Sequence, residues 1–534
     1  MNFKSFFLSV IFSFVFLGWG SFTFGQNQSD KDEIQKIAST MQIIGLFYVD
    51  SVAMNDLVAD AIVKSLKELD PHSAYISKEE LQKANEPLEG SFEGIGVSFQ
   101  LFQDTILIIS PVPGGPSEKL GILSGDKIVK INNEDATGEK VDNQWVMDRL
   151  RGKKGTSVDV SIYRKGRANL LEFSIIRDKI PLNSIDASFM AAPEIGYIRL
   201  NRFSKTSIEE FTKAVDTLKS QGMDKLILDL RGNSGGYLNT AVELSDEFLE
   251  SGKLIVYTEG IHSPRQDFYA TPLGNFEKGK LVIIIDEASA SASEIVSGAV
   301  QDWDRGIVIG RRSFGKGLVQ RPFNLPDGSV IRLTTARYFT PTGRCIQRPY
   351  TNGTEEYYKD FSKRFEHGEY LFADSIRFPD SLKFETPRGR VVYGGGGIMP
   401  DVFIPWDSTM FSDYYVELRR KGVLSNFSLQ YVEENRTYLN DKFPTLASFN
   451  SKFIIDPDMI SEFKNLAEKD SVKFDEKGWK SSEILINTQI KALIARNLWD
   501  ISSFYEVMSP IDEEFIKAVN LLEDKDIFRK LNID

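Results

Sequence analysis

The spacing of hydrophobic residues changes several times along the chain, and it begins with a helical spacing. Between about residues 30 and 88, apolar residues recur every three or four positions, as in Ile34, Ile37 and Met41, which is typical of amphipathic helices. Pro71 follows a second run of this kind and is expected to end it. The pattern predicts a helical region over residues 26–88, arranged as a small bundle.

Residues 89–180 instead carry short runs typical of β-strands, separated by turn residues such as Pro113-Gly114-Gly115. The runs are Gly96–Phe99, Ile106–Ile109, Lys127–Ile131 and Val158–Ile162. A helical pattern around Trp145–Leu150 lies between the last two runs. We therefore expect a small β-rich domain with one or two helices in this part of the chain.

Residues 181–405 alternate between strand and helix patterns. Ile195–Leu200 predicts a strand, and Ser207–Ser220 predicts a helix. The runs Leu226–Leu230 and Leu281–Ile285 are almost continuously apolar, which is typical of strands buried on both faces of an α/β layer. The pattern predicts an α/β core, and with it a multidomain α/β fold for the whole chain.

The remaining segments predict additions to this core. Residues 352–390 are polar and rich in aromatic residues, as in an insertion, and the glycine run 394–397 predicts a tight turn or a close backbone approach. Residues 406–534 are charged and mostly helical, as in Ile484–Leu498 and Glu513–Leu522. We expect a helical C-terminal extension that serves as an accessory or interaction domain.

The N-terminus has the pattern of an export signal. Lys4 precedes the mostly apolar run Phe6–Leu17, and Thr23-Phe24-Gly25 offers small residues at a cleavage site. We expect residues 1–25 to be a signal peptide cleaved after Gly25, with an uncleaved membrane anchor as the alternative. Either case places the working domains outside the cytoplasm.

The composition narrows the classes of function. The 534 residues include 64 Lys and Arg against 76 Asp and Glu, a balance that argues against nucleic acid as the main partner. Cys345 is the single cysteine, so an intrachain disulfide is excluded. The three histidines, His72, His262 and His367, do not have the spacing of a zinc site. We expect no metal, and a base other than histidine for any nucleophile.

Three serines stand where a strand pattern gives way to a helix pattern, in the segment Asp286–Ile295. A serine at such a junction can act as a nucleophile, because the unpaired N–H groups of the helix N-terminus stabilise a developing oxyanion. Helix capping is the commoner role of serines at this position. The segment alone leaves both interpretations open.

Two further segments could complete a catalytic site. Lys316 stands between Gly315 and Gly317, and burial of such a lysine would lower its pKa and let the free amine accept a proton. A phosphate or salt-bridge lysine is the alternative, although the nucleotide P-loop pattern is absent. The apolar run Leu226–Leu230 leads into the glycine-rich segment 231–236. Such a turn can point N–H groups at an anion, or it can be an ordinary strand-to-helix connection.

Together these segments resemble the carboxyl-terminal processing peptidases, also called tail-specific proteases, over roughly residues 35–405. The resemblance is carried by Ser289–Ile295, Phe314–Gln320 and Asp229–Gly236. It implies a peptidase core of the ClpP/crotonase-like type over residues 181–405. The separation of Ser291 and Lys316 matches the Ser-Lys dyad of the family, which implies Ser291 as nucleophile and Lys316 as general base.

The same resemblance implies the residues that assist the dyad. Gln320 matches a third active-site residue, which helps to orient the lysine. The oxyanion hole falls on the N–H group of Ala292 and on a glycine N–H of the 232–236 turn, with Gly235 favoured and Gly236 as the alternative. His72 matches a structural position, so no catalytic histidine is implied.

Residues 89–180 then resemble a PDZ domain. The carboxylate-binding loop of such domains, which binds a peptide C-terminus while the peptide adds a strand, matches Gly94, Ile95, Gly96 and Val97. Arg151 matches an arginine that signals substrate binding to the protease core in relatives. A solvated cation at a helix end is the alternative for Arg151.

These inferences predict an exported serine endopeptidase that cleaves proteins at or near their C-terminal tails. The predicted mechanism is a PDZ-guided Ser-Lys acyl-enzyme reaction with no cofactor, located in the periplasm or cell envelope. The predicted partners are proteins with accessible C-terminal tails, with a homodimer and membrane association through the N-terminal segment as further options. A PDZ-bearing chaperone with a degenerate core and an enzyme of acyl-group chemistry are the alternative functions.

Overall fold

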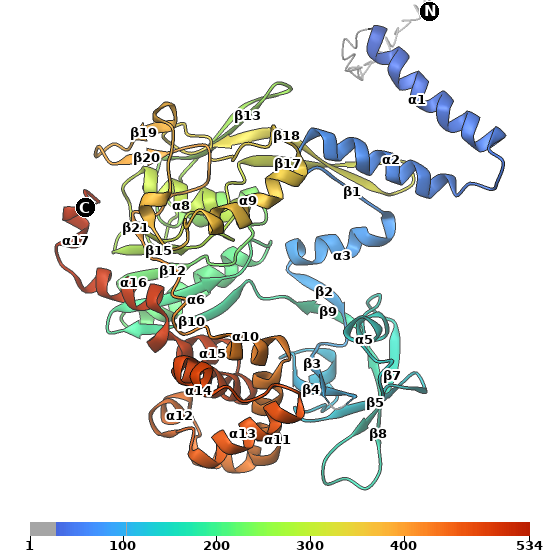
Figure 1. The fold of residues 1–534 in the computed structure, drawn as a ribbon, viewed down its shortest axis with the longest axis vertical. Coiled ribbons are helices and arrows are strands. Elements are labelled where there is room, and N and C mark those ends of the chain that lie inside the picture. Colours follow the sequence, from blue (N-terminus) through green and yellow to red (C-terminus); the bar gives the residue numbers. More distant parts are fainter. Residues whose placement is uncertain (1–27, 103, 534) are drawn as a thin grey trace, which may run out of the picture. The chain divides into compact units, whose positions relative to one another are not determined.

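The computed structural model describes residues 28–102 and 104–533, which form two compact units, residues 1–66 and 67–534 (Figure 1). The predicted signal peptide, residues 1–25, lies outside the described residues. Among the residues that the structure describes, no helix combines the length and the apolar character needed to cross a bilayer.

Within its described residues, the first unit contains one helix and most of a second, as the spacing of apolar residues predicts. They are α1 (Gln28–Phe47) and α2 (Met54–Leu69), and α2 ends two residues before Pro71. The bundle that we expected is not found for α1, because its apolar side chains remain exposed to solvent. Ile37 is 62% exposed and Phe47 is 78% exposed, so periodicity correctly indicated the helix but not its packing.

The small β-rich domain lies in the second unit, and all four predicted strand runs are strands. Its sheet has the order β3-β4-β5-β7-β8, with β6 paired to β5. The elements are β3 (Val97–Phe102), β4 (Thr105–Pro111), α4 (Pro116–Lys119), β5 (Lys127–Ile131), β6 (Glu134–Asp135), α5 (Asn143–Leu150), β7 (Ser157–Tyr163) and β8 (Leu171–Ile176). Before it lie β1 (Ala74–Ile76), α3 (Lys78–Glu89) and β2 (Ser91–Gly94), and β2 pairs with β9 (Asp178–Pro181). Because β3 is an edge strand, it can accept a further strand.

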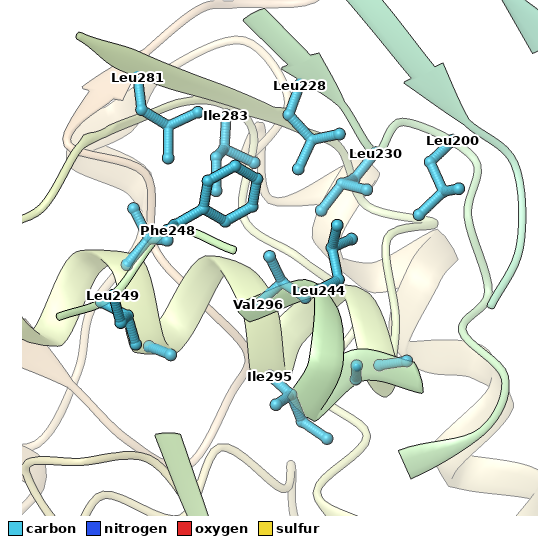
Figure 2. Packing of buried hydrophobic residues seen from close by; sticks show 14 of the residues in the cluster. Leu200, Leu228, Leu230, Leu244, Phe248, Leu249, Leu281, Ile283, Ile295 and Val296 are labelled. Atoms are coloured by element: carbon cyan, nitrogen blue, oxygen red, sulfur yellow. The ribbon is translucent and has the colours of Figure 1, made fainter. Parts of the chain in front are cut away.

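The α/β core is built on a largely parallel sheet of order β10-β11-β12-β15-β16-β21. The strands are β10 (Ile185–Ala192), β11 (Ile195–Leu200), β12 (Lys225–Asp229), β15 (Leu281–Ile285), β16 (Ile307–Gly310) and β21 (Val402–Phe403). One face is covered by α6 (Ser207–Ser220), α7 (Leu238–Asp246) and α8 (Ala292–Asp302). Figure 2 shows Leu228 and Ile283 of the strands facing Leu244 of α7 and Val296 of α8. This packing fixes the start of α8 against the strand ends.

The other face of the same sheet is covered by the C-terminal helices α16 (Glu513–Glu523) and α17 (Ile527–Lys530). Phe515 and Leu522 pack with Ile227 and Ile284 in one buried cluster, and Figure 1 shows α16 beside β12 and β15. The end of the chain is therefore part of the core rather than the separate accessory domain that we expected.

The rest of the extension forms its own apolar core, which includes Phe427, Phe463 and Trp479. Its elements are α10 (Asp413–Arg420), α11 (Val423–Lys442), α12 (Leu446–Lys452), α13 (Pro457–Lys469), α14 (Glu476–Leu498), α15 (Ile501–Met508) and the 3-10 helix η3 (Ser509–Ile511). The predicted helices at 484–498 and 513–522 lie within α14 and α16.

A second sheet stands beside the core. It has the order β1-β18-β13-β14, with β17 also paired to β18. Its further strands are β13 (Leu254–Gly260), β14 (Ser263–Tyr269), β17 (Leu318–Asn324) and β18 (Val330–Phe339). The predicted insertion, residues 352–390, contains α9 (Thr354–Glu366), two 3-10 helices, η1 (Ala373–Ser375) and η2 (Asp380–Leu382), and the strand β19 (Lys383–Glu385). The partner of β19, the strand β20 (Val391–Tyr393), begins directly after it. The glycine run makes a close backbone approach to another segment: the Gly395 N–H donates to the Cys345 carbonyl at 2.7 Å, and the Gly397 N–H donates to the Ile346 carbonyl at 2.9 Å.

We predict that Phe515→Ala lowers the free energy of unfolding by about 3 kcal/mol, the usual cost of removing a buried aromatic side chain. The Phe515 ring lies 5.3 Å from that of Tyr197, centroid to centroid, and is 7% exposed. Urea denaturation measures the change. Ile516→Ala is the matched control, because Ile516 is 39% exposed. Equal effects of the two changes would contradict the packing of α16 on the sheet.

Candidate active site

Ser291 stands at the turn between β15 and α8, in an unusual backbone conformation. Its φ of 55° and ψ of −110° lie in a region that residues other than glycine rarely occupy. Two hydrogen bonds support the strained turn: the Ser291 N–H donates to Glu294 Oε2 at 2.8 Å, and the Tyr338 hydroxyl donates to the Ser291 carbonyl at 3.1 Å. Such strain clusters at functional sites.

The two neighbouring serines have structural roles. The Ser289 hydroxyl donates to the Leu230 carbonyl at 2.8 Å, and the Ser293 hydroxyl donates to the Asn233 carbonyl at 2.9 Å. Both side chains are fully buried, whereas Ser291 lines a cleft of about 1010 Å³. Of the three serines of the segment, Ser291 is therefore the one placed to meet a ligand.

Lys316 and Gln320 line the same cleft as Ser291. Burial lowers the pKa of the Lys316 amine, and the positive charge of Arg332 lowers it further, while Glu294 and Asp70 oppose the shift. Lys316 Nζ lies 3.5 Å from Gln320 Oε1. The structure thus brings a half-buried hydroxyl and a desolvated amine to one cavity. A serine nucleophile with a lysine base needs both groups.

Gln320 is itself held by the chain around His72. Its Nε2 group donates to the His72 carbonyl, and His72 Nε2 lies 2.9 Å from the Tyr357 hydroxyl. Burial and the charge of Lys316 lower the pKa of His72 to about 4, so the ring is neutral near pH 7. These contacts give His72 a supporting position behind Gln320.

Glu294 is a site residue that our reading of the sequence missed. Its carboxylate is fully buried and accepts hydrogen bonds from the Ser291 N–H, and from the Ser313 hydroxyl, the Gly315 N–H and the Lys316 N–H at 2.6, 2.6 and 2.9 Å. Burial raises its pKa, and these hydrogen bonds oppose the shift. The Ser-x-x-Glu spacing from Ser291 to Glu294 is the capping-box pattern and could have indicated the residue.

The glycine-rich turn lies directly against the Ser291 turn. A Cβ atom on Gly235 would lie 2.8 Å from Cβ of Ser291 and 3.0 Å from the nitrogen of Ala292, and one on Gly236 would lie 2.0 Å from the Phe203 carbonyl oxygen. Both positions therefore require glycine. The Gly235 N–H already donates to Asn233 Oδ1 at 2.9 Å. Among the described residues the Gly236 N–H has no such partner, and Ala292 begins α8, where N–H groups lack intrahelical acceptors.

The predicted carboxylate-binding loop connects β2 to the edge strand β3. Gly94 ends β2, Val97 begins β3, and the Ile95 carbonyl between them accepts from the Ser117 hydroxyl at 2.7 Å. Gly96 has a φ of 74°, which favours glycine. The loop is thus a braced turn next to the edge strand of the sheet, the arrangement used for peptide binding by strand addition.

Arg151 lies outside the cleft, at the end of α5. Its Nη1 group donates to Glu86 Oε2 of α3 at 2.6 Å, and its guanidinium lies 4.5 Å from the centroid of the Phe92 ring. Other α3 residues, including Leu81 and Asn85, line the cleft. The contact therefore joins the β-rich domain to a helix of the cleft wall.

Cysteine chemistry finds little support in this geometry. Burial raises the pKa of the Cys345 thiol, which disfavours the reactive thiolate, and Cys345 is not part of the cleft lining. Within residues 28–102 and 104–533, no three His, Cys, Asp or Glu side chains are grouped as a metal site.

Sequence comparisons match three separate parts of the chain to known families. Residues 194–356 match peptidase family S41, and residues 94–175 match the PDZ domain. Residues 414–500 match a family of unknown function.

Individual relatives extend this picture. The chain is 35% identical over 327 residues to the carboxy-terminal processing protease CtpB of Bacillus subtilis (strain 168), an alignment that covers 60% of this chain and 68% of CtpB. It is 34% identical to a carboxy-terminal-processing protease of Bartonella bacilliformis, over 61% of this chain and 75% of the relative. Among solved structures, the chain is similar to the photosystem II D1 C-terminal processing protease, with 25% identity and a TM-score of 0.36. The match covers 70% of this chain and 93% of that protein.

We predict that Glu294→Gln slows the reaction of Ser291 with a fluorophosphonate by about 100-fold, because small displacements of a reacting group have effects of this size. The new amide NH₂ would face N–H donors that the carboxylate now accepts. Labelling kinetics measure the rate, and circular dichroism checks the fold. Glu209→Gln, at an exposed position in the first turn of α6, is the control. Labelling of Glu294→Gln at the wild-type rate would refute this role.

Proposed function

Because the chain belongs to the carboxy-terminal processing proteases, serine peptidases of family S41, we propose that it cleaves other proteins at or near their C-terminal tails, with Ser291 as nucleophile and Lys316 as general base. The observation that carries the proposal is the meeting of a strained Ser291 and a desolvated Lys316 in one cleft. A lysine with a lowered pKa is neutral in a larger fraction of molecules and can accept the serine proton.

The proposed reaction has two stages. Neutral Lys316 takes the proton of the Ser291 hydroxyl, whose oxygen attacks the scissile carbonyl. The protonated lysine then gives its proton to the leaving amine, and an acyl-enzyme remains. Lys316 next takes a proton from water, the resulting hydroxide attacks the ester, and the proton returns to Ser291. Gln320 keeps the amine in place through its contact at 3.5 Å.

For the oxyanion hole we propose the N–H groups of Ala292 and Gly236. Gly235 was favoured from the sequence, but its N–H is engaged by Asn233. Its contribution is the close approach of the turn, since any side chain there would collide with Ser291. Preorganised N–H donors of this kind stabilise the negative charge that develops in the transition state.

Substrate delivery is assigned to the β-rich domain. We propose that the loop Gly94, Ile95, Gly96 and Val97 binds the terminal carboxylate of a tail, while the tail pairs with the open edge of β3. Arg151 would report this binding to the cleft through Glu86, its partner on α3. The volume of the cleft, about 1010 Å³, is sufficient for an extended peptide segment.

The remaining features of the proposal concern location and organisation. We propose export by the segment 1–25 and action in the periplasm or cell envelope, with no cofactor and with homodimerisation open to test. The domain limits proposed from the sequence are 26–88, 89–180, 181–405 and 406–534. In support, each family match falls inside one of these ranges.

The first prediction from this mechanism is that Ser291→Ala and Lys316→Ala each reduce cleavage by about 10⁴-fold or more, as for other catalytic dyads and triads. The substrate is an unfolded reporter with an apolar C-terminal tail, assayed by gel and mass spectrometry with and without EDTA. Ser251→Ala and Lys213→Ala, at exposed positions, are the matched controls.

The outcomes separate the alternatives. Cleavage by the wild type and the controls alone, unaffected by EDTA, supports the dyad. Equal cleavage by all variants would exclude it. Binding of the tail without cleavage by the wild type would indicate a chaperone, and turnover of thioesters but not peptides would indicate acyl-group chemistry.

The second prediction concerns pH. Because neutral Lys316 is the active form, kcat should rise with pH through the lysine pKa, which lies below its ordinary value of 10.5. Arg332→Gln removes a like charge, raises the pKa of Lys316 and should move the profile to higher pH. Arg321→Gln changes another cleft-lining arginine and serves as the control. A shift of the Arg332→Gln profile to lower pH would be inconsistent with Lys316 as the base.

A further inference from the structure

The first turn of the C-terminal helix α16 contacts the beginning of the glycine-rich turn. Arg231 Nη1 donates to Asp512 Oδ1 at 3.0 Å and to Glu514 Oε2 at 3.2 Å, and its Nη2 donates to Asp512 Oδ2 at 2.7 Å. Asp512 is the N-cap of α16, and the Arg231 side chain is only 13% exposed. A bidentate arginine–carboxylate pair of this kind has a defined geometry as well as a charge.

Glu514 also reaches a second strand end. Arg311, which follows β16, donates from Nη1 to Glu514 Oε1 at 2.6 Å, and from Nε to Glu287 at 2.8 Å. Arg231 follows β12. In the sheet, β12 and β16 are the two neighbours of β15, the strand that leads to Ser291. The two carboxylates of α16 thus span the strand that carries the nucleophile.

The backbone of Arg231 is held as closely as its side chain. Its N–H donates to Asp229 Oδ1 at 2.9 Å, and its carbonyl accepts from Arg199 Nη2 at 3.0 Å. The next residue, Gly232, donates its N–H to Asp286 at 3.0 Å. Further along, the Asn233 carbonyl accepts from the Ala290 N–H at 3.0 Å. A displacement of Arg231 would therefore be passed to the turn that ends in Gly235 and Gly236, and to the Ser291 turn.

The charges explain why the α16 carboxylates are needed there. Asp229 is fully buried and accepts hydrogen bonds from both Arg199 and Arg231. One buried carboxylate cannot balance two arginines, and an uncompensated buried charge is strongly unfavourable. Asp512 and Glu514 supply the missing negative charge. Without them, the Arg231 guanidinium would keep only its hydrogen bonds to Asp229, a carboxylate that it shares with Arg199.

We propose that Asp512 and Glu514 are positioning residues for the oxyanion hole. Through Arg231 they keep the 231–236 turn in its position beside Ser291. This gives the C-terminal extension, whose residues 414–500 match a family of unknown function, a role in the chemistry of the core. The inference rests on the proposed function, because it assumes that the turn binds an oxyanion.

The test compares Glu514→Gln and Asp512→Asn with Glu513→Gln in the full chain. Asparagine caps helices as well as aspartate does, so Asp512→Asn removes charge without removing the cap. Glu513 is exposed on the same turn, so its variant is a control matched in chemistry. We measure kcat and KM on the tailed reporter, the affinity for a peptide boronate, and the melting temperature. A boronate forms a tetrahedral adduct on the serine and so reports on the oxyanion hole.

We expect Glu514→Gln and Asp512→Asn to lower kcat by roughly ten- to hundredfold, with KM nearly unchanged and boronate affinity lowered by a similar factor. Glu514→Asp should recover part of the loss. Values of kcat and boronate affinity equal to those of Glu513→Gln would overturn the proposal. So would a loss that disappears when the assay is cooled well below the melting temperature, because it would show that the two residues contribute only to stability. A wild type that neither cleaves nor binds the boronate would instead refute the proposed function.

Discussion

Four hydrogen bonds converge on the buried carboxylate of Glu294, and the geometry of the cleft depends on them. One comes from the Ser291 N–H, and the others come from the segment that carries Lys316. The two candidate catalytic residues belong to different parts of the fold, since Ser291 follows a strand of the core and Lys316 precedes a strand of the second sheet. A carboxylate is suited to join them, because it only accepts hydrogen bonds and can satisfy several backbone donors at once.

Around this contact, segments from distant parts of the sequence each supply one support. The chain at His72 offers a carbonyl to Gln320, and the insertion supplies the Tyr357 hydroxyl next to the His72 ring. On the far side, the glycine-rich turn approaches Ser291 so closely that a side chain at Gly235 is excluded. Hydrogen bonds and close packing thus support the cleft where the chemistry is proposed. Such preorganisation allows fixed N–H donors to stabilise charge without rearrangement.

The C-terminal extension differs from a domain that is simply attached. Its last helices bury one face of the central sheet, and the first turn of α16 places two carboxylates on arginines at the strand ends. The apolar packing holds the helix on the sheet. The ion pairs fix the position of its first turn relative to the glycine-rich turn. Stability of the core and order at the proposed oxyanion hole therefore depend on the same helix.

Much of the fold was predictable from local pattern. The almost continuously apolar runs 226–230 and 281–285 correspond to the central strands β12 and β15, and the range 207–220 is the helix α6. These elements are predictable because burial on both faces and helical periodicity each give a characteristic pattern of apolar residues. The family was also recognisable from its motifs, and the comparisons confirm it. The expected bundle was wrong for α1, because periodicity reports which face is apolar and not what covers it.

The sequence by itself determined the family, the order of the elements and the short motifs, because these depend on neighbouring residues. Only the tertiary structure decided which of the three serines lines the cleft, which glycine N–H is already engaged, and that Glu294 joins the segments that carry Ser291 and Lys316. The same holds for the contact between Arg231 and Asp512, which are separated by most of the protease core and the extension. These features depend on hydrogen bonds between residues far apart in the chain and on which side chains the fold buries. Only folding brings such residues together.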